Sequence, residues 1–258
     1  RLVGFAGRLI TASATFGIAV LFGATLFSGN NFGTVPMTLI YVLLGCSVQF
    51  LIGLGLAYLC SLPIAGRAFF RVVFFVPLMI TPVGIAYQWR MLADMRLGPV
   101  TPLWHWAGLG EFAWGSNALA ARLMVMVADG WMWIPFMFVV MLAALETVSR
   151  DQVEAAEVDG AGKWFIFRDI TWPQIAPVAG TVVLIRWIEG FKLVDIPNVM
   201  TNGGPGIATE TLTMHSWTRW RSLDFAGSSA VAYTLLVVAV IICVSFFNFV
   251  IRKHAHRL

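Results

Sequence analysis

The sequence predicts an all-α membrane protein with about six transmembrane helices. Of its 258 residues, 59% are hydrophobic and only 12% are charged, and the mean hydropathy is +0.82. A soluble domain has about 25% charged and about 45–50% apolar residues. The composition therefore excludes a soluble globule, a disordered chain and a disulfide scaffold. The basic residues form no polar face that would bind nucleic acid. We interpret residues 1–258 as a single transmembrane domain.

Six apolar segments are candidates for spans, because a helix needs about 20 mostly apolar residues to cross the hydrocarbon layer. The first of them is the weakest, since Thr, Ser and Gly residues interrupt it. The six segments are Leu9–Phe27, Leu39–Leu59, Val72–Trp89, Leu123–Leu145, Ile175–Asn198 and Ser229–Ile251.

The distribution of basic residues predicts the orientation, because Lys and Arg in short loops favour the cytoplasmic side. If both termini, Ser61–Arg71 and Glu146–Pro173 share one side, that side holds ten Lys and Arg and the other holds five. The remaining two lie within a span. This asymmetry predicts cytoplasmic N- and C-termini, and it places residues 200–228 in an external loop.

The longest polar stretch, residues 149–173, predicts a helix–turn–helix at the cytoplasmic face. Ser149 followed by Gln152 is a capping-box pattern, which indicates a helix start. Gly160–Gly162 would break that helix, and Lys163–Trp172 would form a second short helix ended by Pro173. This loop is either a solvated connection or a docking element for a cytoplasmic partner.

The same stretch resembles the EAA loop of ABC importer permeases. That family's pattern is EAA, three residues, Gly, nine residues and then I-x-L-P, and only Trp172 departs from it. The matching residues are Glu154, Ala155, Ala156, Gly160, Ile170 and Pro173.

Two more segments resemble the carbohydrate-type branch of these permeases, which includes the maltose and glycerol-3-phosphate permeases. Thr201–Leu212 (TNGGPGIATETL) is similar to its T-x-GGP-x(3)-TETL segment, and Phe191–Ile196 is similar to its F-K-x-x-D-I stretch. The resemblance extends over roughly Thr38–Phe247 and does not include residues 1–37.

The resemblance implies a type I ABC importer permease of the bacterial plasma (inner) membrane that imports a sugar or related polyol. Its implied partners are a second homologous permease, two ATPase subunits, an extracytoplasmic solute-binding protein and the lipid bilayer. The chain itself would have no catalytic residue and no cofactor, because ATP and Mg are bound by the ATPases. The EAA-loop residues would then couple ATPase closure to alternating access. Gly203, Gly204 and Pro205 specify a tight turn, which either contacts the binding protein or is a simple hairpin.

Four charged residues fall at i+3 spacing within the predicted fifth span: Arg186, Glu189, Lys192 and Asp195. Their alternating signs predict ion pairs along one helix, and charges at this depth must face the bundle interior or a wet cavity. They form either a polar wall of the substrate pathway or a ladder that fixes the helix against the partner permease. Asp129 beside Trp131 is a candidate saccharide contact, although packing is the commoner role for such a tryptophan.

Two rival interpretations come from other functional classes. An ion-coupled secondary carrier would use the Arg186–Asp195 ladder as its coupling site, and a structural scaffold would need no such site. Neither requires the EAA loop. ATP binding by Gly160–Lys163 is excluded, because a P-loop needs Gly where Glu157 stands and Ser or Thr where Trp164 stands.

Overall fold

The structure is a computed structural model, and it describes residues 33–62, 67–108 and 111–248. Every regular element in these ranges is helical. The elements are α2 (Thr34–Leu39), a π-helical segment (Ile40–Gly45), α3 (Cys46–Ser61), α4 (Arg67–Phe75), a 3-10 turn (Val76–Met79), α5 (Pro82–Leu92), α6 (Val100–Trp106), α7 (Ala118–Glu146), α8 (Arg150–Val158), α9 (Lys163–Phe165), a second π-helical segment (Ile166–Thr171), α10 (Trp172–Phe191), α11 (Asp195–Thr201), α12 (Leu212–Arg221) and α13 (Phe225–Phe246).

Three continuous helices contain three of the predicted spans. Thr34–Ser61 forms one helix of 28 residues, α7 has 29 residues and α13 has 22, and all three are long and apolar enough to cross a membrane. They contain Leu39–Leu59, Leu123–Leu145 and most of the last predicted span. Leu9–Phe27 lies outside the described residues. Within the described ranges, three helices meet the requirement, or four if a bent pair is counted as one span, so the predicted six are not established.

The predicted span Val72–Trp89 is wrong as a single straight helix. Phe69–Met79 and Pro82–Leu92 meet at an angle of 102°. The cause lies in two prolines, because Pro77 and Pro82 lack the N–H that a continuing helix needs. Pro82 instead begins α5, where Thr81 caps the helix by accepting from the backbone N–H of Gly84 at 3.3 Å.

The predicted span Ile175–Asn198 is also broken. α10 ends at Phe191 and α11 begins at Asp195. Pro197 explains the break, since a proline in the interior of a helix removes a hydrogen bond and clashes with the preceding turn, whereas the first turn tolerates it. Asp195 therefore lies on a different helix from Arg186.

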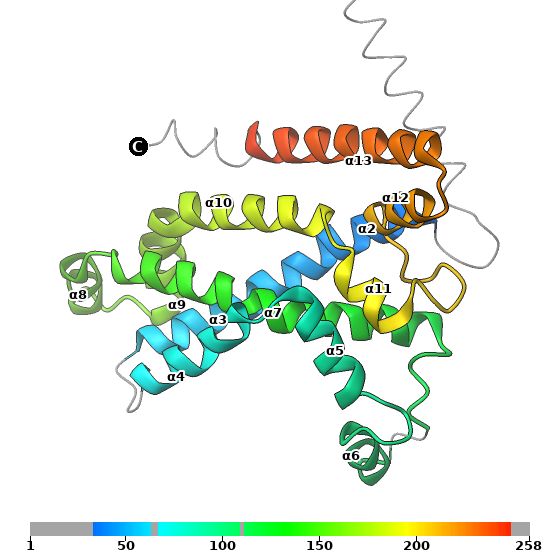
Figure 1. The fold of residues 1–258 in the computed structure, drawn as a ribbon. Helices are drawn as coiled ribbons and strands as arrows, with labels where there is room; N and C mark the ends of the chain where they lie inside the picture. Colours follow the sequence, from blue (N-terminus) through cyan, green and yellow to red (C-terminus); the bar gives the residue numbers. More distant parts are fainter. Residues whose placement is uncertain (1–32, 63–66, 109–110, 249–258) are drawn as a thin grey trace, which may run out of the picture.

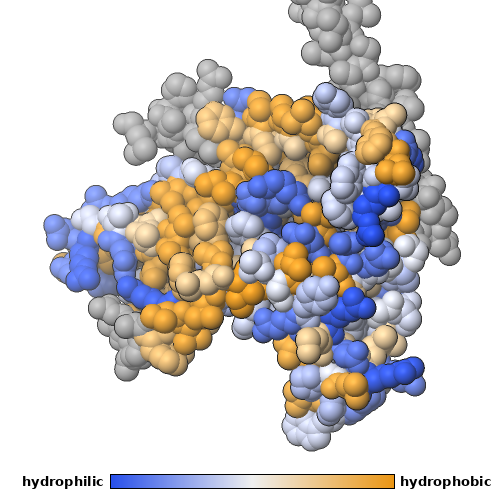
Figure 2. Space-filling view, in the orientation of Figure 1, coloured by the Kyte–Doolittle hydropathy of each residue, from blue (hydrophilic) through white to orange (hydrophobic). Residues whose placement is uncertain are grey.

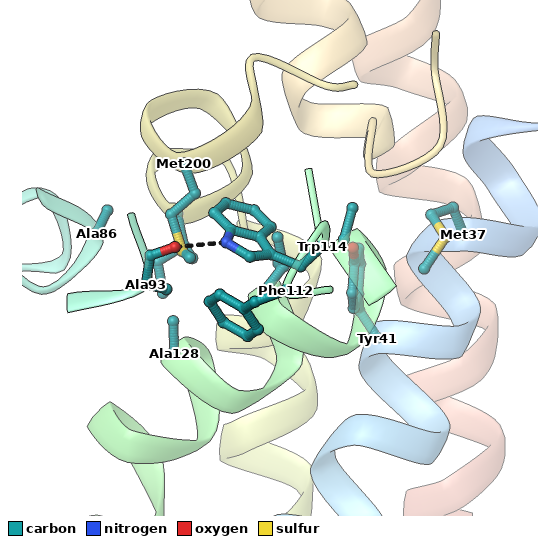
Figure 3. Packing of buried hydrophobic residues seen from close by; sticks show 11 residues of the cluster. Met37, Tyr41, Ala86, Ala93, Phe112, Trp114, Ala128 and Met200 are labelled. Atoms are coloured by element: carbon teal, nitrogen blue, oxygen red, sulfur yellow. Dashed lines mark hydrogen bonds between the residues drawn. The ribbon is translucent and has the colours of Figure 1, made fainter. Parts of the chain in front are cut away.

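Close packing of α3 against α7 forms the centre of the bundle. Gly53 makes this approach possible, because a Cβ at this position would lie 2.5 Å from Met137 Cβ and 3.1 Å from the Phe138 backbone N. Buried residues of α3, α7 and α10 form one apolar cluster. A second cluster joins the start of α7 to residues near α5 and α11. There the Trp114 indole donates to the Ala93 carbonyl at 2.6 Å (Figure 3).

The surface of the bundle carries a polar end at α8 and large apolar areas on its long helices. α8 lies at one end of the molecule, α6 projects near the other, and α13 forms an outer edge beside α10 (Figure 1). Figure 2 shows hydrophilic side chains around the α8 end and hydrophobic ones over α13 and the region of α3 and α4, with hydrophilic groups between the orange areas toward the right of the view. Only 6% of the apolar window of α13 is buried. This surface pattern is that of a protein whose long helices face lipid or other membrane helices.

Candidate functional site

The predicted coupling loop, residues 149–173, forms two helical arms joined by a tight turn. α8 is the first arm, and α9 with the π-helical segment Ile166–Thr171 is the second. The start of α8 after Ser149 agrees with the prediction, but the capping box is wrong, because Ser149 makes no side-chain cap bond. Gln152 Oε1 instead accepts from Gln174 Nε2 at 2.8 Å. This bond links the first arm to the first turn of α10.

The turn between the arms is a Schellman motif centred on Gly160. The Ala161 N–H donates to the Ala156 carbonyl at 2.9 Å, and the Gly160 N–H donates to the Glu157 carbonyl at 3.0 Å. Gly160 has φ +79, a conformation that costs other L-residues about 1–2 kcal/mol. A Cβ there would meet nothing within 4 Å. The requirement for glycine is therefore conformational rather than a matter of space.

The second arm does not end at Pro173 as predicted. It continues through the π-helical segment into α10, where Pro173 occupies the first turn. In a π-helical segment each backbone hydrogen bond joins residues five apart instead of four. The hydrogen-bond register can therefore change just before Pro173, which lacks an N–H. Trp172, which replaces the family's Leu, packs beside Phe167 with ring centroids 6.3 Å apart.

The motif residues are presented at the surface of this loop. Glu154, Ala155 and Pro173 are exposed, while Ala156 and Ile170 are half-buried. Beneath α8 lies a cavity of about 700 Å³ whose lining includes three carboxylates and Arg150. The carboxylates are Glu146, Glu154 and Glu157. Glu146 already pairs with Arg71 at 2.5 Å. Glu154 and Glu157 make no ion pair within the described part of the chain, so their negative charge is not neutralised by a basic side chain there.

A buried polar centre joins the three core helices. Arg186 of α10 is 1% exposed and pairs with the Asp129 carboxylate of α7. Its Nε donates to Gln49 Oε1 of α3 at 2.8 Å, and Gln49 Nε2 donates to Asp129 Oδ2 at 2.7 Å. The guanidinium also lies over the Trp133 ring, 4.8 Å from its centroid. The guanidinium is thus paired with a carboxylate and also contacts an amide oxygen and an aromatic face, as burial of an ion requires.

The predicted ladder from Arg186 to Asp195 is wrong as a continuous series. Arg186 pairs across the bundle with Asp129 rather than with Glu189. Only Glu189 and Lys192 pair along the helix, at 2.6 Å, and their side chains are 33% and 61% exposed. Asp195 is half-buried at the start of α11. The break at Pro197 and the competing carboxylate on α7 account for this difference.

Trp131 is separated from Asp129 despite their closeness in sequence. It is 46% exposed, packs edge-on against Trp89 at 6.1 Å and borders an apolar cavity of about 250 Å³ with Pro77 and Pro135. The structure therefore brings Arg186 and Asp129 together, but it leaves Trp131 and the Glu189–Lys192 pair at other places.

The segment Thr201–Leu212 forms a compact loop, not a simple hairpin. Thr201 and Thr209 share a hydroxyl hydrogen bond at 2.6 Å, and the Thr209 N–H donates to the Gly203 carbonyl at 3.0 Å. Gly203 has φ +83 and is buried. Of the three predicted contact residues, Gly204 and Pro205 are thus the ones that reach the surface, where they are half-buried.

Gln49 and a series of hydrogen-bonded polar side chains along α12 and its two ends are not among the residues predicted from the sequence. Gln49 is the one strongly polar side chain in a predicted span without charges, and that signal could have identified it. On α12, His215 bonds Glu210 at 2.7 Å and accepts from Arg219 at 3.1 Å. Arg219 also pairs with Asp224 at 2.8 Å. Two hydrogen bonds to its carboxylate hold the pKa of Asp224 below its ordinary value: the larger effect comes from the Gly227 backbone N–H and the next from the Arg219 side chain.

Comparison with known families identifies the protein class. Residues 49–257 match the family described as binding-protein-dependent transport system inner membrane component. The chain belongs to this family. It is therefore a permease component of a binding-protein-dependent transport system, and it is a multi-pass protein of the inner membrane.

Curated relatives of this permease are themselves named as permease subunits. The chain is 30% identical over 218 residues to the probable ABC transporter permease y4oQ of Sinorhizobium fredii, covering 83% of this chain and 70% of that protein. It is 26% identical over 211 residues to the trehalose/maltose transport system permease MalF of Thermococcus litoralis, covering 82% and 70%. It is 30% identical over 220 residues to the sn-glycerol-3-phosphate permease UgpA of Pectobacterium atrosepticum, covering 84% and 74%. This chain is accordingly a permease subunit and not an enzyme.

A solved structure has the same fold as this permease. It is a bacterial alginate ABC transporter in complex with an alginate pentasaccharide-bound periplasmic protein. The TM-score is 0.79 at 20% identity, and the match covers 90% of this chain and 83% of that one. A second alginate transporter structure matches with a TM-score of 0.76 at 19% identity, covering 97% and 95%. The predicted all-α permease fold is therefore confirmed.

Proposed function

We propose that this permease imports a sugar or related polyol and couples closure of partner ATPases to alternating access. The observation that carries the proposal is the coupling loop. Its glycine turn holds α8 in a fixed relation to the second arm, and Glu154 and Glu157 extend from α8 with no basic partner among the residues that the structure describes. The names of MalF and UgpA support a saccharide or polyol phosphate as the substrate class.

In this proposal the assembly contains a second homologous permease, two ATPase subunits and an extracytoplasmic solute-binding protein. ATP and Mg²⁺ are bound by the ATPases. Both termini and residues 149–173 face the cytoplasm, and Gly204 and Pro205 face the binding protein. Glu189, Lys192 and Trp131, whose side chains are at least partly exposed, are the candidates for contact with substrate along the pathway.

We assign the Arg186–Asp129–Gln49 centre a bracing role. The side chains of Arg186, Gln49 and Asp129 are hydrogen-bonded to one another, and Arg186 is almost fully buried. A substrate hydroxyl would have to break these bonds to gain access.

The experiment that tests the coupling compares Gly160→Val with Gly162→Ala in proteoliposomes that hold the complete importer. Gly160 needs φ +79, which a β-branched residue opposes, whereas Gly162 has φ −72 and open space around its Cβ position. We expect Gly160→Val to lower the uptake per ATP hydrolysed at least several-fold while assembly persists. Gly162→Ala should retain normal coupling. Normal uptake in Gly160→Val would contradict the coupling assignment, and ATP-independent uptake driven by an ion gradient would support a secondary carrier.

A further inference from the structure

A groove lies between α3 and the second arm of the coupling loop. Its volume is about 370 Å³, and we define the α3–α9 groove by six of its residues. They are Leu51, Leu54 and Gly55 on the α3 wall and Lys163, Trp164 and Phe167 at the mouth. α9 lies near the same end of the molecule as α8 (Figure 1). The groove adjoins the acidic cavity beneath α8, since Tyr58 lines both, but its other lining residues are different.

The wall of the groove is apolar and belongs to a helix that can span the membrane. Leu51 is 66% exposed, and Gly55 leaves a gap because a Cβ there would meet nothing within 4 Å. From Leu51 to Tyr58 the wall comprises eight residues, which span about 10 Å along the helix axis. This surface has the shape and polarity to hold part of an acyl chain.

The mouth of the groove has the opposite character. Lys163 is exposed and takes part in none of the ion pairs of the described residues, whereas nearby Arg168 pairs with Asp169 at 3.0 Å. Trp164 is 70% exposed and stacks on Phe167 with centroids 5.9 Å apart. Aromatic rings beside a cation are typical of the level at which lipid headgroups meet water.

We propose that the α3–α9 groove binds an anionic phospholipid of the cytoplasmic leaflet, with its phosphate on Lys163 and an acyl chain along Leu51 and Gly55. The charge of Lys163 complements the anionic lipids of that leaflet. The proposal rests on the cytoplasmic orientation of residues 149–173. Tyr58 contacts Phe167 edge-on at 5.6 Å and also borders the acidic cavity, so a lipid in this groove lies against the coupling loop.

Retention of phosphatidylglycerol tests the headgroup contact. The full chain, purified with its co-assembled subunits, is equilibrated in nanodiscs of phosphatidylcholine with added phosphatidylglycerol, and native mass spectrometry counts the retained lipids. Lys163→Gln should lower phosphatidylglycerol retention about fivefold, the equivalent of about 1 kcal/mol for one lysine near an anionic surface, and Lys163→Arg should preserve it. Equal retention by wild type and Lys163→Gln would overturn the proposal.

Filling the groove tests the acyl-chain contact. Gly55→Leu should reduce retention of both lipids, whereas Ser47→Leu, on an exposed turn of the same helix, should leave it unchanged. A photocrosslinking residue at Leu51 should become attached to lipid. Attachment to a protein chain instead would show that another subunit covers the groove, which refutes the proposal. These measurements do not depend on transport. The lipid proposal can therefore be refuted while the proposed permease function stands, and the proposed permease function can be refuted while the lipid proposal stands.

Discussion

Replacing Arg186 by Met should destabilise the protein more than any change to its exposed charges. The replacement leaves the Asp129 carboxylate buried beside Gln49 without its cation, and it also removes the cation–π contact with Trp133. Loss of one partner of a buried pair costs about 3–5 kcal/mol. The matched control is Lys192→Met, which breaks the exposed pair with Glu189 and should cost about 0.2–1 kcal/mol.

The free energy of unfolding in mixed micelles, measured by titration with a denaturing detergent, provides the assay. Arg186→Met combined with Asp129→Asn should recover more than half of the loss, because no charge then remains and the amide can still accept from Gln49. If Arg186→Met costs no more than Lys192→Met, the inference of a compensated buried ion is refuted.

The double variant also separates the two roles of the polar centre. A double variant that is stable and transports normally supports the bracing role. A double variant that is stable but has lost transport would assign Arg186 and Asp129 to the substrate pathway instead.

Three further predictions concern packing, pH and the apolar cluster of Figure 3. Gly53→Ala should destabilise the α3–α7 contact by about 1–3 kcal/mol, because the added Cβ would lie 2.5 Å from Met137 Cβ on the facing helix. Gly55→Ala is the control and should be tolerated, because the space around its Cβ position is open. Thermal unfolding in detergent compares the two variants. The pKa of Asp224 is lower in the folded protein than its ordinary value of 3.8, so this carboxylate stabilises the fold at pH values above 3.8. The stabilisation is lost as the pH falls through the lower pKa of the folded state. Asp224→Asn should remove this acid dependence of the thermal midpoint. Trp114→Phe leaves the Ala93 carbonyl without its 2.6 Å donor and should cost about 1–3 kcal/mol, and hydrogen exchange near that turn should increase.

The helical class and the helix–turn–helix form of residues 149–173 could be predicted from the sequence because local signals determine them. The charge-free run of Leu39–Leu59 is sufficient for a span, and a glycine after α8 is sufficient for a turn. Pro173 begins a helix rather than ending one, because proline is compatible with the first turn of a helix. The π-helical segment before it leaves no such mark in the sequence.

The pairing of the charges could not be predicted, because it depends on how α3, α7 and α10 approach one another. Spacing along one chain favoured Arg186 with Glu189, while the actual partner, Asp129, lies 57 residues away. Pro197 indicates the break before Asp195, whereas the hydropathy of Ile175–Asn198 does not.

The continuity of the second arm with α10 has a mechanical consequence. From Lys163 to Phe191 the chain is helical without interruption, a path of roughly 40 Å at the rise of an α-helix. One end lies in the loop, and near the other end Arg186 is tied to two neighbouring helices. A helix held near one end tilts about that point more readily than it slides along its axis. A displacement of the loop would therefore move the Lys163 end most, and the movement would diminish toward Arg186.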